Sequence, residues 1–365
     1  MKIIHIIPSF SPGGAEITVK NLAIELSKKN DVEVWALAKS KDESFEKKYM
    51  DQLEQHHVRM VKFNKEYRGN RIKVILKLRE QIQTSQPDII NTHLEYVNIY
   101  TVIASLGLGI PIVHIVHNIK IKYAWIYRLF LKLFTSKFVA ISVKVGDIIQ
   151  KKLNLPPSKI RLIYNGIRLQ EYQSTKRIER ENVSHIIAVG RLMPQKDYPN
   201  LLRAYKELLF LLSRQSIEPP QLNIVGDGYL KNELLKMAEQ LNIASSVNFL
   251  GIRTDISHLL ANSDLYIMAS KWEGFSISLI EALASGIPII ATSVGSNGEL
   301  IENNKNGLLL VSGRPDLLAK AMLELILNKE LRRRFSKNGP DIAKKFSIET
   351  CAEGYLKLYF DLIKR

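Results

Sequence analysis

Short apolar segments rich in isoleucine and valine alternate with amphipathic helical segments from one end of this chain to the other. Such alternation is typical of parallel β-sheets whose strands are joined by helices. The strands that we expect are Lys2–Ile7, Asp31–Leu37, Asp88–Thr92, Pro111–Val116 and Lys137–Ile141 in the first half, and His185–Val189, Gln221–Val225, Ser246–Leu250, Leu265–Met268 and Ile287–Ala291 in the second. These two sets predict an α/β chain with two doubly wound, Rossmann-like domains in tandem.

With 365 residues, the chain has room for two domains of ordinary size. We expect the first over residues 1–168 and the second over residues 169–344, with a helix of about 345–365 packing back on the first. The polar segment Leu169–Val183, which has no glycine or proline, is predicted to be the linker. Because open α/β sheets bind ligands at the carboxyl ends of their strands, we expect two domains facing each other across a cleft.

Positive charge is concentrated in the first half of the chain. The formal net charge is +16; residues 1–168 hold 27 Lys and Arg against 14 Asp and Glu, whereas residues 169–365 hold 25 against 22. This asymmetry favours a polyanionic partner for the first domain, such as an anionic bilayer, a phosphorylated lipid or nucleic acid. A basic surface that is merely solvated is the alternative.

Aromatic and apolar residues with interleaved cations make up the segment Tyr123–Phe134, which is flanked by Lys120, Lys122 and Lys137. This composition is typical of a helix that lies on a membrane surface. An internal helix packed on a sheet would look similar, so both interpretations remain open.

Several classes of protein lose support from what the sequence lacks. The single cysteine, Cys351, excludes an intramolecular disulfide and a multi-cysteine zinc site. No apolar run reaches the length of a membrane span, and the opening Met1–Ile7 is too short for the core of a signal peptide. We therefore expect a cytoplasmic location.

Two glutamates bracket the start of a predicted helix, Glu273 just before it and Glu281 eight positions later on nearly the same face. Gly274 and Ser276 stand at the entry, where free backbone amides can hold an anion or sugar hydroxyls. A glutamate on an apolar inner face is unfavourable unless a polar group meets it, and a ligand rich in hydroxyls would do so. A capped core helix whose glutamates bond to backbone or point outward is the alternative.

A glycine pair, Gly13 and Gly14, follows the first strand and precedes a helix that contains Glu16. Such a turn lets the backbone approach a phosphate closely, although it can also be only a tight turn. Gly107-Leu108-Gly109 and Gly226-Asp227-Gly228 lack the third glycine of a dinucleotide fingerprint, and no phosphate loop of the GK[ST] type occurs. Hydride transfer and ATP hydrolysis therefore lose support.

Four further side chains follow strands. His93 and His117 could bond a substrate hydroxyl or a developing charge, or could be structural. Neither lies at metal-ligand spacing with other candidates, and no Asp-x-Asp occurs, so we predict no required metal. Arg191 and Lys196 suit a diphosphate, one as a fork and one as a point charge, unless they are ordinary surface cations.

Together these motifs resemble the retaining GT-B glycosyltransferases of family 4 (group 1) over nearly the whole chain. The resemblance implies that Gly13-Gly14 lies beneath the donor diphosphate, that His117 lies against the transferred sugar, and that Arg191 and Lys196 clamp the diphosphate. Further matching motifs are Ser142-Val143-Lys144 and Asn165-Gly166-Ile167 before the domain crossover, and Gly226-Asp227-Gly228 and Gly251-Ile252-Arg253 bordering the base pocket.

The paired glutamates also match that family. Glu273 is implied to contact the donor sugar and Glu281 the ribose, with main-chain contacts to sugar and phosphate from Phe275, Ser276 and Ile277. Glu299 ends a downstream motif of the group. The chain departs from the common pattern at Ser293, Ser296 and Ser276, which weakens any inference about which sugar is used.

The resemblance implies a metal-independent retaining transferase that takes a hexose-type sugar from a nucleoside-diphosphate sugar and needs no cofactor. Its catalytic residues would be His117, Arg191, Lys196 and Glu273. The charge imbalance and the aromatic segment lead us to expect, as acceptor on the first domain, a glycan or lipid-linked glycan in the assembly of a surface polysaccharide such as lipopolysaccharide or capsule, at the cytoplasmic face of the membrane. Glu16 and His93 are acceptor-side candidates.

Two alternatives remain open from the sequence. A related enzyme could act on the nucleotide sugar itself, as an epimerase or a hydrolase. The chain could also be a non-catalytic polyanion-binding protein, although no recognition motif for nucleic acid occurs, so nucleic acid is not an expected partner.

Overall fold

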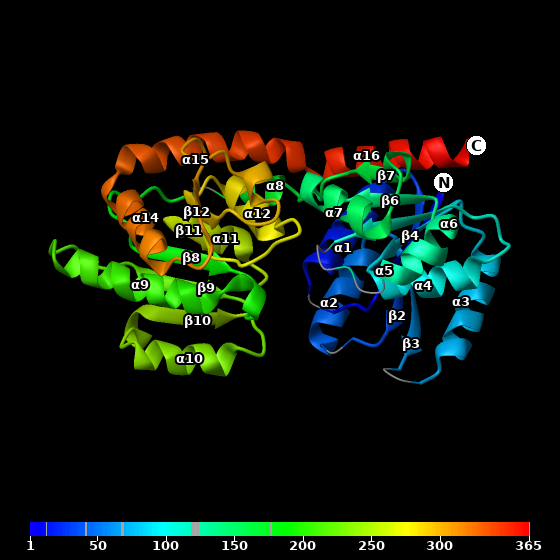
Figure 1. Ribbon diagram of the computed structural model, residues 1–365, viewed down its shortest axis with the longest axis horizontal. Coiled ribbons are helices and arrows are strands. Elements are labelled where there is room, and N and C mark those ends of the chain that lie inside the picture. Colours follow the sequence, from blue (N-terminus) through cyan, green and yellow to red (C-terminus); the bar gives the residue numbers. More distant parts are fainter. Residues whose placement is uncertain are drawn as a thin grey trace. The chain divides into compact units, whose positions relative to one another are not determined.

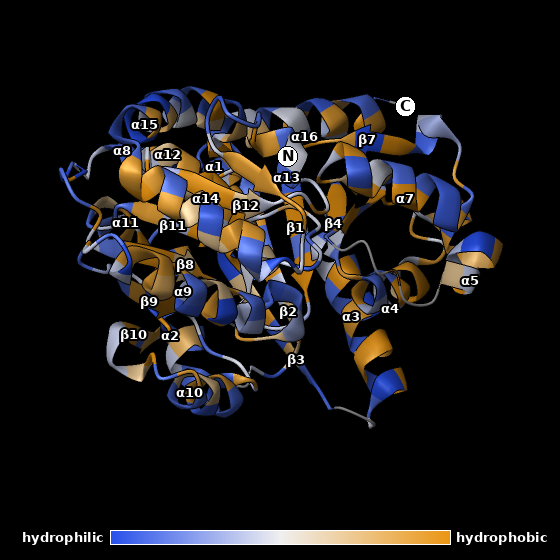
Figure 2. Ribbon diagram, turned by 60° about the vertical axis from the view of Figure 1, so that its left-hand side comes forward, coloured by the Kyte–Doolittle hydropathy of each residue, from blue (hydrophilic) through white to orange (hydrophobic). Residues whose placement is uncertain are grey.

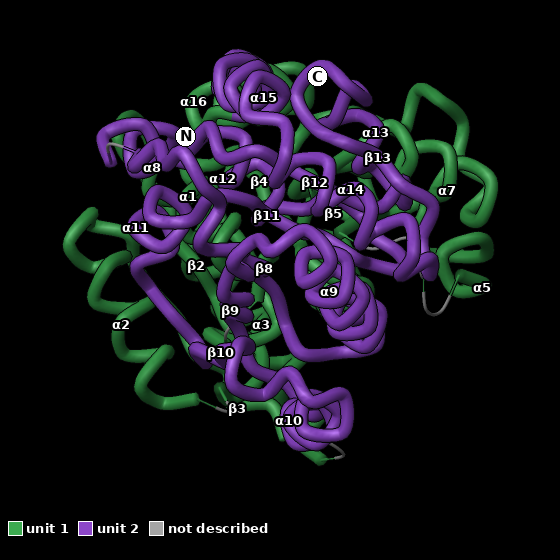
Figure 3. Tube along the Cα trace, turned by 90° about the vertical axis from the view of Figure 1, so that its left-hand side faces the viewer, with its two compact units in different colours: residues 1–167, 347–365 green, residues 168–346 purple. Residues whose placement is uncertain are grey.

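Two compact α/β units make up the chain. The computed structural model describes residues 1–11, 13–40, 42–66, 69–117, 121, 124–175 and 177–364. One unit consists of Met1–Ile167 and Ser347–Arg365, and the other of Arg168–Phe346 (Figure 3). Each is built around one parallel sheet, so the predicted fold class of two Rossmann-like domains is confirmed (Figure 1).

The sheet of the first unit has seven strands in the order β3-β2-β1-β4-β5-β6-β7. Its strands are β1 (Lys2–Ile7), β2 (Asp31–Ala38), β3 (Arg59–Lys65), β4 (Ile89–His93), β5 (Ile112–Val116), β6 (Lys137–Ala140) and β7 (Ile160–Leu162). The order reverses between β1 and β4, and this reversal is the point at which doubly wound sheets bind ligands.

Helices cover both faces of this sheet. They are α1 (Gly14–Ser27), α2 (Glu43–Glu54), α3 (Arg71–Ser85), α4 (Glu95–Ser105), α5 (Ala124–Ile126), α6 (Lys132–Phe134), α7 (Val143–Leu153) and α16 (Ile348–Ile363). Ile4, Ile6 and Ile90 pack in one buried cluster with residues of α3 and α4. Because successive strand side chains alternate between the faces, His5 and Asn91 point to the opposite face. The last helix, α16, packs against α1 within this unit (Figure 1).

The second unit holds a six-stranded sheet in the order β10-β9-β8-β11-β12-β13. Its strands are β8 (His185–Val189), β9 (Gln221–Val225), β10 (Val247–Gly251), β11 (Leu265–Met268), β12 (Ile289–Thr292) and β13 (Leu308–Leu310). Its helices are α8 (Gln170–Gln173), α9 (Tyr198–Ser213), α10 (Lys231–Gln240), α11 (Ile256–Ala261), α12 (Ile277–Ser285), α13 (Asn297–Leu300), α14 (Pro315–Leu327) and α15 (Lys329–Ala343).

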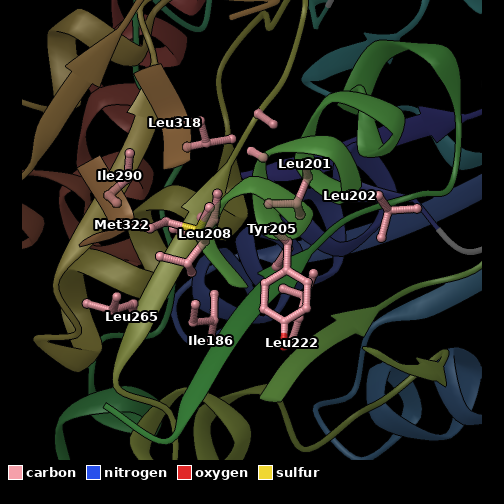
Figure 4. Packing of buried hydrophobic residues seen from close by; sticks show 14 of the residues in the cluster. Ile186, Leu201, Leu202, Tyr205, Leu208, Leu222, Leu265, Ile290, Leu318 and Met322 are labelled. Carbon is pink, nitrogen blue, oxygen red and sulfur yellow. The ribbon is translucent and has the colours of Figure 1, made fainter. Parts of the chain in front are cut away.

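One face of α9 builds much of the core of this unit. Leu201, Tyr205 and Leu208 recur at spacings of four and three residues, so they share a face of the helix and are fully buried. They pack with Leu318 and Met322 of α14 in one cluster that includes strand residues of the sheet (Figure 4). Each buried side chain of this size contributes about 1.5–3 kcal/mol relative to solvent exposure. This core holds the strand ends of the second unit in fixed positions.

The expected linker was wrong, because Leu169–Val183 packs on the second unit. Tyr172 is buried there and Val183 belongs to the hydrophobic core. Arg180 donates a hydrogen bond to a carboxylate oxygen of Asp264 at 3.2 Å. Arg180 of this segment therefore serves as a partner for the unit rather than as part of a solvated linker.

The predicted aromatic segment forms a short irregular helix. Helix α5, a π-helical turn over Tyr127–Leu131 and helix α6 follow one another without a break. The residues at the start of the expected segment and in its flank, Tyr123, Lys120 and Lys122, lie outside the described residues. Tyr127 and Leu131 are buried while most of the other described residues are exposed, so the segment packs on the unit through one face only. The membrane-surface interpretation stays a prediction.

Candidate functional site

The candidate residues of the second unit gather at the carboxyl ends of its strands. Arg191 and Lys196 follow β8, Gly226 follows β9, Arg253 follows β10 and Glu273 follows β11. All neighbouring strands pair in parallel, so these loops emerge at one edge of the sheet. That edge is where open α/β sheets place their ligands.

A buried ion pair lies at the centre of this edge. Nζ of Lys196 donates a hydrogen bond to Oε1 of Glu273 at 2.7 Å, and the two side chains are 16% and 5% exposed. Glu273 also accepts hydrogen bonds from the Ser270 hydroxyl at 2.7 Å and from the Gln195 side-chain amide at 3.1 Å. A carboxylate that accepts hydrogen bonds from three donors keeps a fixed orientation.

A small pocket opens beside the ion pair. It is lined by residues at the ends of β8 and β11, among them Val189, Lys196, Met268 and Ser270. Arg191, two residues after β8, is exposed. The pocket therefore has one partly buried cation in its wall, and an exposed guanidinium lies on the same loop.

Two glycines bring these loops together more closely than any other residue allows. Gly226 has a φ of +133°, and a Cβ built on it would lie 2.1 Å from the carbonyl oxygen of Gly190. Gly295 has a φ of +56°, and its Cβ would lie 1.9 Å from the carbonyl oxygen of Glu273. Left-handed backbone and contact with a carbonyl both exclude a side chain. Gly295 thus fixes the backbone of Glu273 itself.

Helix α12 begins at Ile277, immediately after Phe275 and Ser276, which are both buried. The hydroxyl of its cap residue, Ser276, lies 3.3 Å from the hydroxyl of Ser278 and does not cap a backbone amide. The first backbone amides of a helix have no intrahelical acceptor. The hydroxyl of Ser296 donates to the carbonyl of Gly274 at 2.7 Å and holds the preceding loop. This hydrogen bond gives a structural role to Ser296, one of the three serines at which the chain departs from the common pattern of the family.

Glu281 has a different partner from Glu273. The Tyr172 hydroxyl donates a hydrogen bond to Oε1 of Glu281 at 2.7 Å, and burial raises the pKa of this carboxyl above its ordinary value. The nearby charge of Lys196 acts in the opposite direction. Tyr172, in the segment that we expected to be a linker, thus holds the carboxylate that we expected to bind ligand. The sequence analysis did not identify Tyr172.

Arg253 already has a partner on its own loop. Its guanidinium forms a two-pronged hydrogen bond with Asp255, at 2.8 and 2.6 Å, and this bond raises the pKa of the arginine. Both side chains are exposed, so solvent screens the pair and it contributes little to the stability of the unit.

In the first unit, the predicted glycine turn precedes helix α1. Gly13 is the cap residue, in extended conformation, and Gly14 is the first residue of the helix. A Cβ on Gly13 would lie 2.1 Å from Oε2 of Glu16, so the carboxylate folds over the start of its own helix. Negative charge is favourable at this end of a helix.

Three histidines form a chain across the centre of the first sheet. Nδ1 of His5 lies 3.3 Å from Nε2 of His93, whose Nδ1 lies 3.0 Å from Nε2 of His117. Burial lowers the pKa of His5 to about 3 and of His117 to about 4, and holds that of His93 well below its usual range. All three rings are therefore neutral near pH 7. His93 is 2% exposed and both its nitrogens face histidines, so it supports His117.

Sequence reasoning missed His5. It lies within β1, in the otherwise apolar Lys2–Ile7, and not after a strand. A histidine inside a fully buried strand is itself a signal, because a buried polar ring requires a partner. Its Nε2 is buried without a hydrogen-bond partner among the described residues.

The described part of the chain has neither a metal-binding cluster nor a membrane-spanning helix. No group of three or more His, Cys, Asp or Glu side chains is arranged there to hold a metal ion. None of its helices combines the length and the apolar character that crossing a bilayer requires.

Two family models match this chain in succession. The model described as glycosyltransferase family 4 matches residues 12–171, and the one described as glycosyl transferases group 1 matches residues 170–341. Together they span both units.

Similar proteins extend over most of the chain. The Escherichia coli protein named UDP-Gal:alpha-D-GlcNAc-diphosphoundecaprenol alpha-1,3-galactosyltransferase is 26% identical over 313 residues, with 80% of each chain covered. A Campylobacter jejuni protein named GalNAc-alpha-(1->4)-GalNAc-alpha-(1->3)-diNAcBac-PP-undecaprenol alpha-1,4-N-acetyl-D-galactosaminyltransferase is 28% identical over 367 residues, covering 98% of both. The crystal structure of Anabaena HepE in complex with UDP-glucose has the same fold, with a TM-score of 0.84 at 24% identity over 99% of this chain and 100% of that one.

Proposed function

This chain belongs to the GT-B glycosyltransferases of family 4, group 1, and we propose that it transfers a hexose-type sugar, with retained configuration, from a nucleoside-diphosphate sugar to a lipid-linked glycan. The observation that carries the donor half of this proposal is the ion pair of Lys196 and Glu273 beside a pocket at the strand ends. It combines a cation for a diphosphate with a carboxylate for a sugar.

Leaving-group stabilisation is the proposed source of catalysis. As the glycosidic bond lengthens, negative charge builds on the diphosphate and positive charge on the sugar ring. Arg191 and Lys196 stabilise the diphosphate, together with the unpartnered amides at the start of α12. Glu273 faces the positive charge of the ring. Fixed cations and helix amides supply this stabilisation without a metal ion.

The ribose of the donor is assigned to Glu281. An ionised carboxylate accepts hydrogen bonds from two adjacent hydroxyls, and the Tyr172 hydroxyl holds one of its oxygens in place. Because we assign Glu281 to the ribose, the two glutamates do not form the acid–nucleophile pair of a glycoside hydrolase.

His117 is assigned to a hydroxyl of the transferred sugar, and the histidine chain determines which proton it presents. A neutral imidazole has one N–H and one lone pair, so the chain has a direction. If His117 donated from Nε2, the N–H of His5 at Nε2 would be buried without a partner, which is rare in proteins. In the opposite direction, Nδ1 of His5 donates to Nε2 of His93, and Nδ1 of His93 donates to Nε2 of His117. Nε2 of His5 then carries only a lone pair, and His117 presents its Nδ1–H as a donor.

The acceptor is proposed to be a glycan on a lipid diphosphate, in surface polysaccharide assembly at the cytoplasmic face of the membrane. Two observations support this. Both named relatives act on glycans linked through a diphosphate to undecaprenol. The first half of the chain also carries a net charge of +13, from 27 cations and 14 anions, which suits an anionic membrane surface.

A donor panel tests this function. A ligand of the folded state raises the apparent melting temperature, so UDP and GDP and their sugars should be compared, uridine first because the E. coli relative is named for UDP-Gal. We expect stabilisation by one family of nucleotides, unchanged in the presence of EDTA, and little release of nucleotide from donor without acceptor. Rapid conversion of the donor alone would indicate an epimerase or hydrolase, and strong salt-sensitive binding of nucleic acid without any donor binding would indicate a polyanion-binding protein.

A further inference from the structure

Five large apolar side chains stand exposed on one short segment of the first unit, Ala124–Phe134. They are Trp125, Leu129 and Leu133, which are 65%, 73% and 68% exposed, and Phe130 and Phe134, which are 40% and 41% exposed. We call these five residues the apolar patch. Residues 125, 129 and 133 are spaced by four, as are 130 and 134, so they form two adjacent rows on a helical segment. At α5 the ribbon carries both hydrophobic and hydrophilic residues (Figure 2).

The patch cannot turn inward, because the other face of the segment is firmly attached. Tyr127 and Leu131 are buried. The Tyr127 hydroxyl lies 3.2 Å from Nε2 of His114 and donates to the carbonyl of Glu95 at 3.2 Å. The rings of Phe130 and Phe134 lie 4.6 Å apart on the outer side. The exposure of the patch is therefore a property of the folded unit.

Along the chain, the patch and the elements that follow it are rich in cations and poor in acidic residues. Between Ala124 and Leu162 the chain has eight Lys and Arg residues and one acidic residue, Asp147. Nε of Arg128 donates to the carbonyl of Lys152 at 2.7 Å, which fixes the patch beside the last turn of α7. Lys151 and Lys152 in that turn are exposed.

We propose that the apolar patch and the lysines of α7 dock the first unit on an anionic lipid bilayer, with the five side chains inserted among the headgroups. A protein partner would need acidic groups for this surface and would bury it in a dry interface, whereas an anionic bilayer supplies negative charge and an apolar layer together. Aromatic rings at the boundary and lysines above it match the order of a membrane interface. The biological role of this docking, access to a lipid-linked acceptor, rests on the proposed function. The docking itself does not depend on that function.

Vesicle flotation of the full chain, without donor or acceptor, tests the docking. We expect binding to vesicles of phosphatidylcholine with phosphatidylglycerol, weak binding to phosphatidylcholine alone, and release by high salt. Leu129→Ser with Leu133→Ser should weaken the partition at least about tenfold, because both exposed apolar chains are lost. Lys151→Gln with Lys152→Gln should weaken it about 30-fold.

Matched controls lie in the second unit. Phe210 and Leu327 are 57% and 54% exposed, so Phe210→Ser with Leu327→Ser removes similar apolar surface. Lys236→Gln with Lys320→Gln removes two exposed lysines. Both control variants should bind vesicles as the parent chain does.

Insertion has a direct optical signature. Of the three tryptophans, Trp35 is fully buried, Trp272 of the second unit is partly buried and Trp125 is 65% exposed. Membrane insertion should shift the Trp125 emission to the blue, and brominated lipid should quench it. The quenching should disappear in Trp125→Phe.

Equal flotation of the patch variants and the parent chain would overturn the proposal. So would a concentration-dependent dimer that the leucine variant abolishes without any vesicle binding, since a second copy would then cover the patch. Nucleotide binding is measured without vesicles, so loss of docking and loss of the proposed transferase function give separate results.

Discussion

The ammonium nitrogen of Lys196 lies 2.7 Å from Oε1 of Glu273, and both side chains are largely buried. The cation that we assign to the donor diphosphate is therefore occupied by the carboxylate that we assign to the donor sugar. A diphosphate that enters must compete with Glu273 for this ammonium group. Binding of the donor then releases the carboxylate toward the sugar, where positive charge develops.

The first prediction concerns this competition. Glu273→Gln should lower kcat about 100-fold, because the neutral amide cannot stabilise the positive ring. The same variant should bind nucleoside diphosphate more tightly, since Lys196 loses its competing charge. Transfer kinetics and calorimetric titration measure the two effects. A parallel loss of diphosphate affinity and kcat would show that Glu273 does not compete for Lys196.

The second prediction concerns the raised pKa of Glu281. When the pKa of a carboxyl is higher in the folded than in the unfolded protein, the free energy of unfolding falls as the pH rises from the unfolded pKa through the folded pKa. Glu281→Gln should remove this loss, so the melting temperature at pH 7 should equal or exceed that of the parent chain. Donor affinity should fall about tenfold, because the amide accepts fewer ribose hydroxyls. Tyr172→Phe, which removes the hydroxyl at 2.7 Å, should weaken donor binding less.

The third prediction tests the support of Glu273 by Gly295. A Cβ at position 295 would lie 1.9 Å from the Glu273 carbonyl oxygen, so Gly295→Ala should destabilise the second unit by ~1–3 kcal/mol and weaken donor binding. Gly298→Ala is the matched control, because a Cβ there meets nothing within 4 Å. Equal melting temperatures and donor affinities for the two variants would contradict the close contact.

The fourth prediction concerns the histidines of the first unit. Burial lowers the pKa of His5 and of His114 to about 3 and that of His117 to about 4, while unfolded histidine titrates near 6.5. The contribution of these neutral rings to the free energy of unfolding is complete above pH 6.5. As the pH falls toward 4, the free energy of unfolding decreases by up to about 1.4 kcal/mol per pH unit for each ring.

Denaturant unfolding at pH 7 and pH 5 measures this loss. His5→Asn should reduce the pH dependence by about one proton, even if it lowers stability at pH 7. His56→Gln, at an exposed histidine, is the control and should leave the pH dependence unchanged. An unaltered pH dependence in His5→Asn would contradict the assigned neutral chain.

Most of the fold could be predicted from the sequence, because buried parallel strands are continuous apolar runs between helices. All ten expected strands are present, with ends that differ by two residues or fewer. The strands that we missed are β3, β7 and β13, and each of them lies at an end of its sheet. The edge strand Arg59–Lys65 is only partly buried and mixes charged with apolar residues, so it lacks the continuous apolar run of a central strand.

Partners distant in sequence could not be predicted. His5 and His93 are 88 residues apart, and Tyr172 and Glu281 are 109 apart, so no local pattern connects either pair. The pairing of Lys196 with Glu273, 77 residues apart, also depends on the packing of β8 beside β11. The sequence identified the reactive side chains after strands, and the fold determines which of them meet.

The most direct test of the whole account is sugar transfer by the double variant Arg191→Gln with Lys196→Gln. Without both cations the departing diphosphate loses its charge stabilisation, so kcat/KM should fall by about 10⁴ while circular dichroism shows that the fold is retained. Lys206→Ala, at an exposed position of α9, should retain full activity. Undiminished transfer by a correctly folded double variant would contradict the central claim.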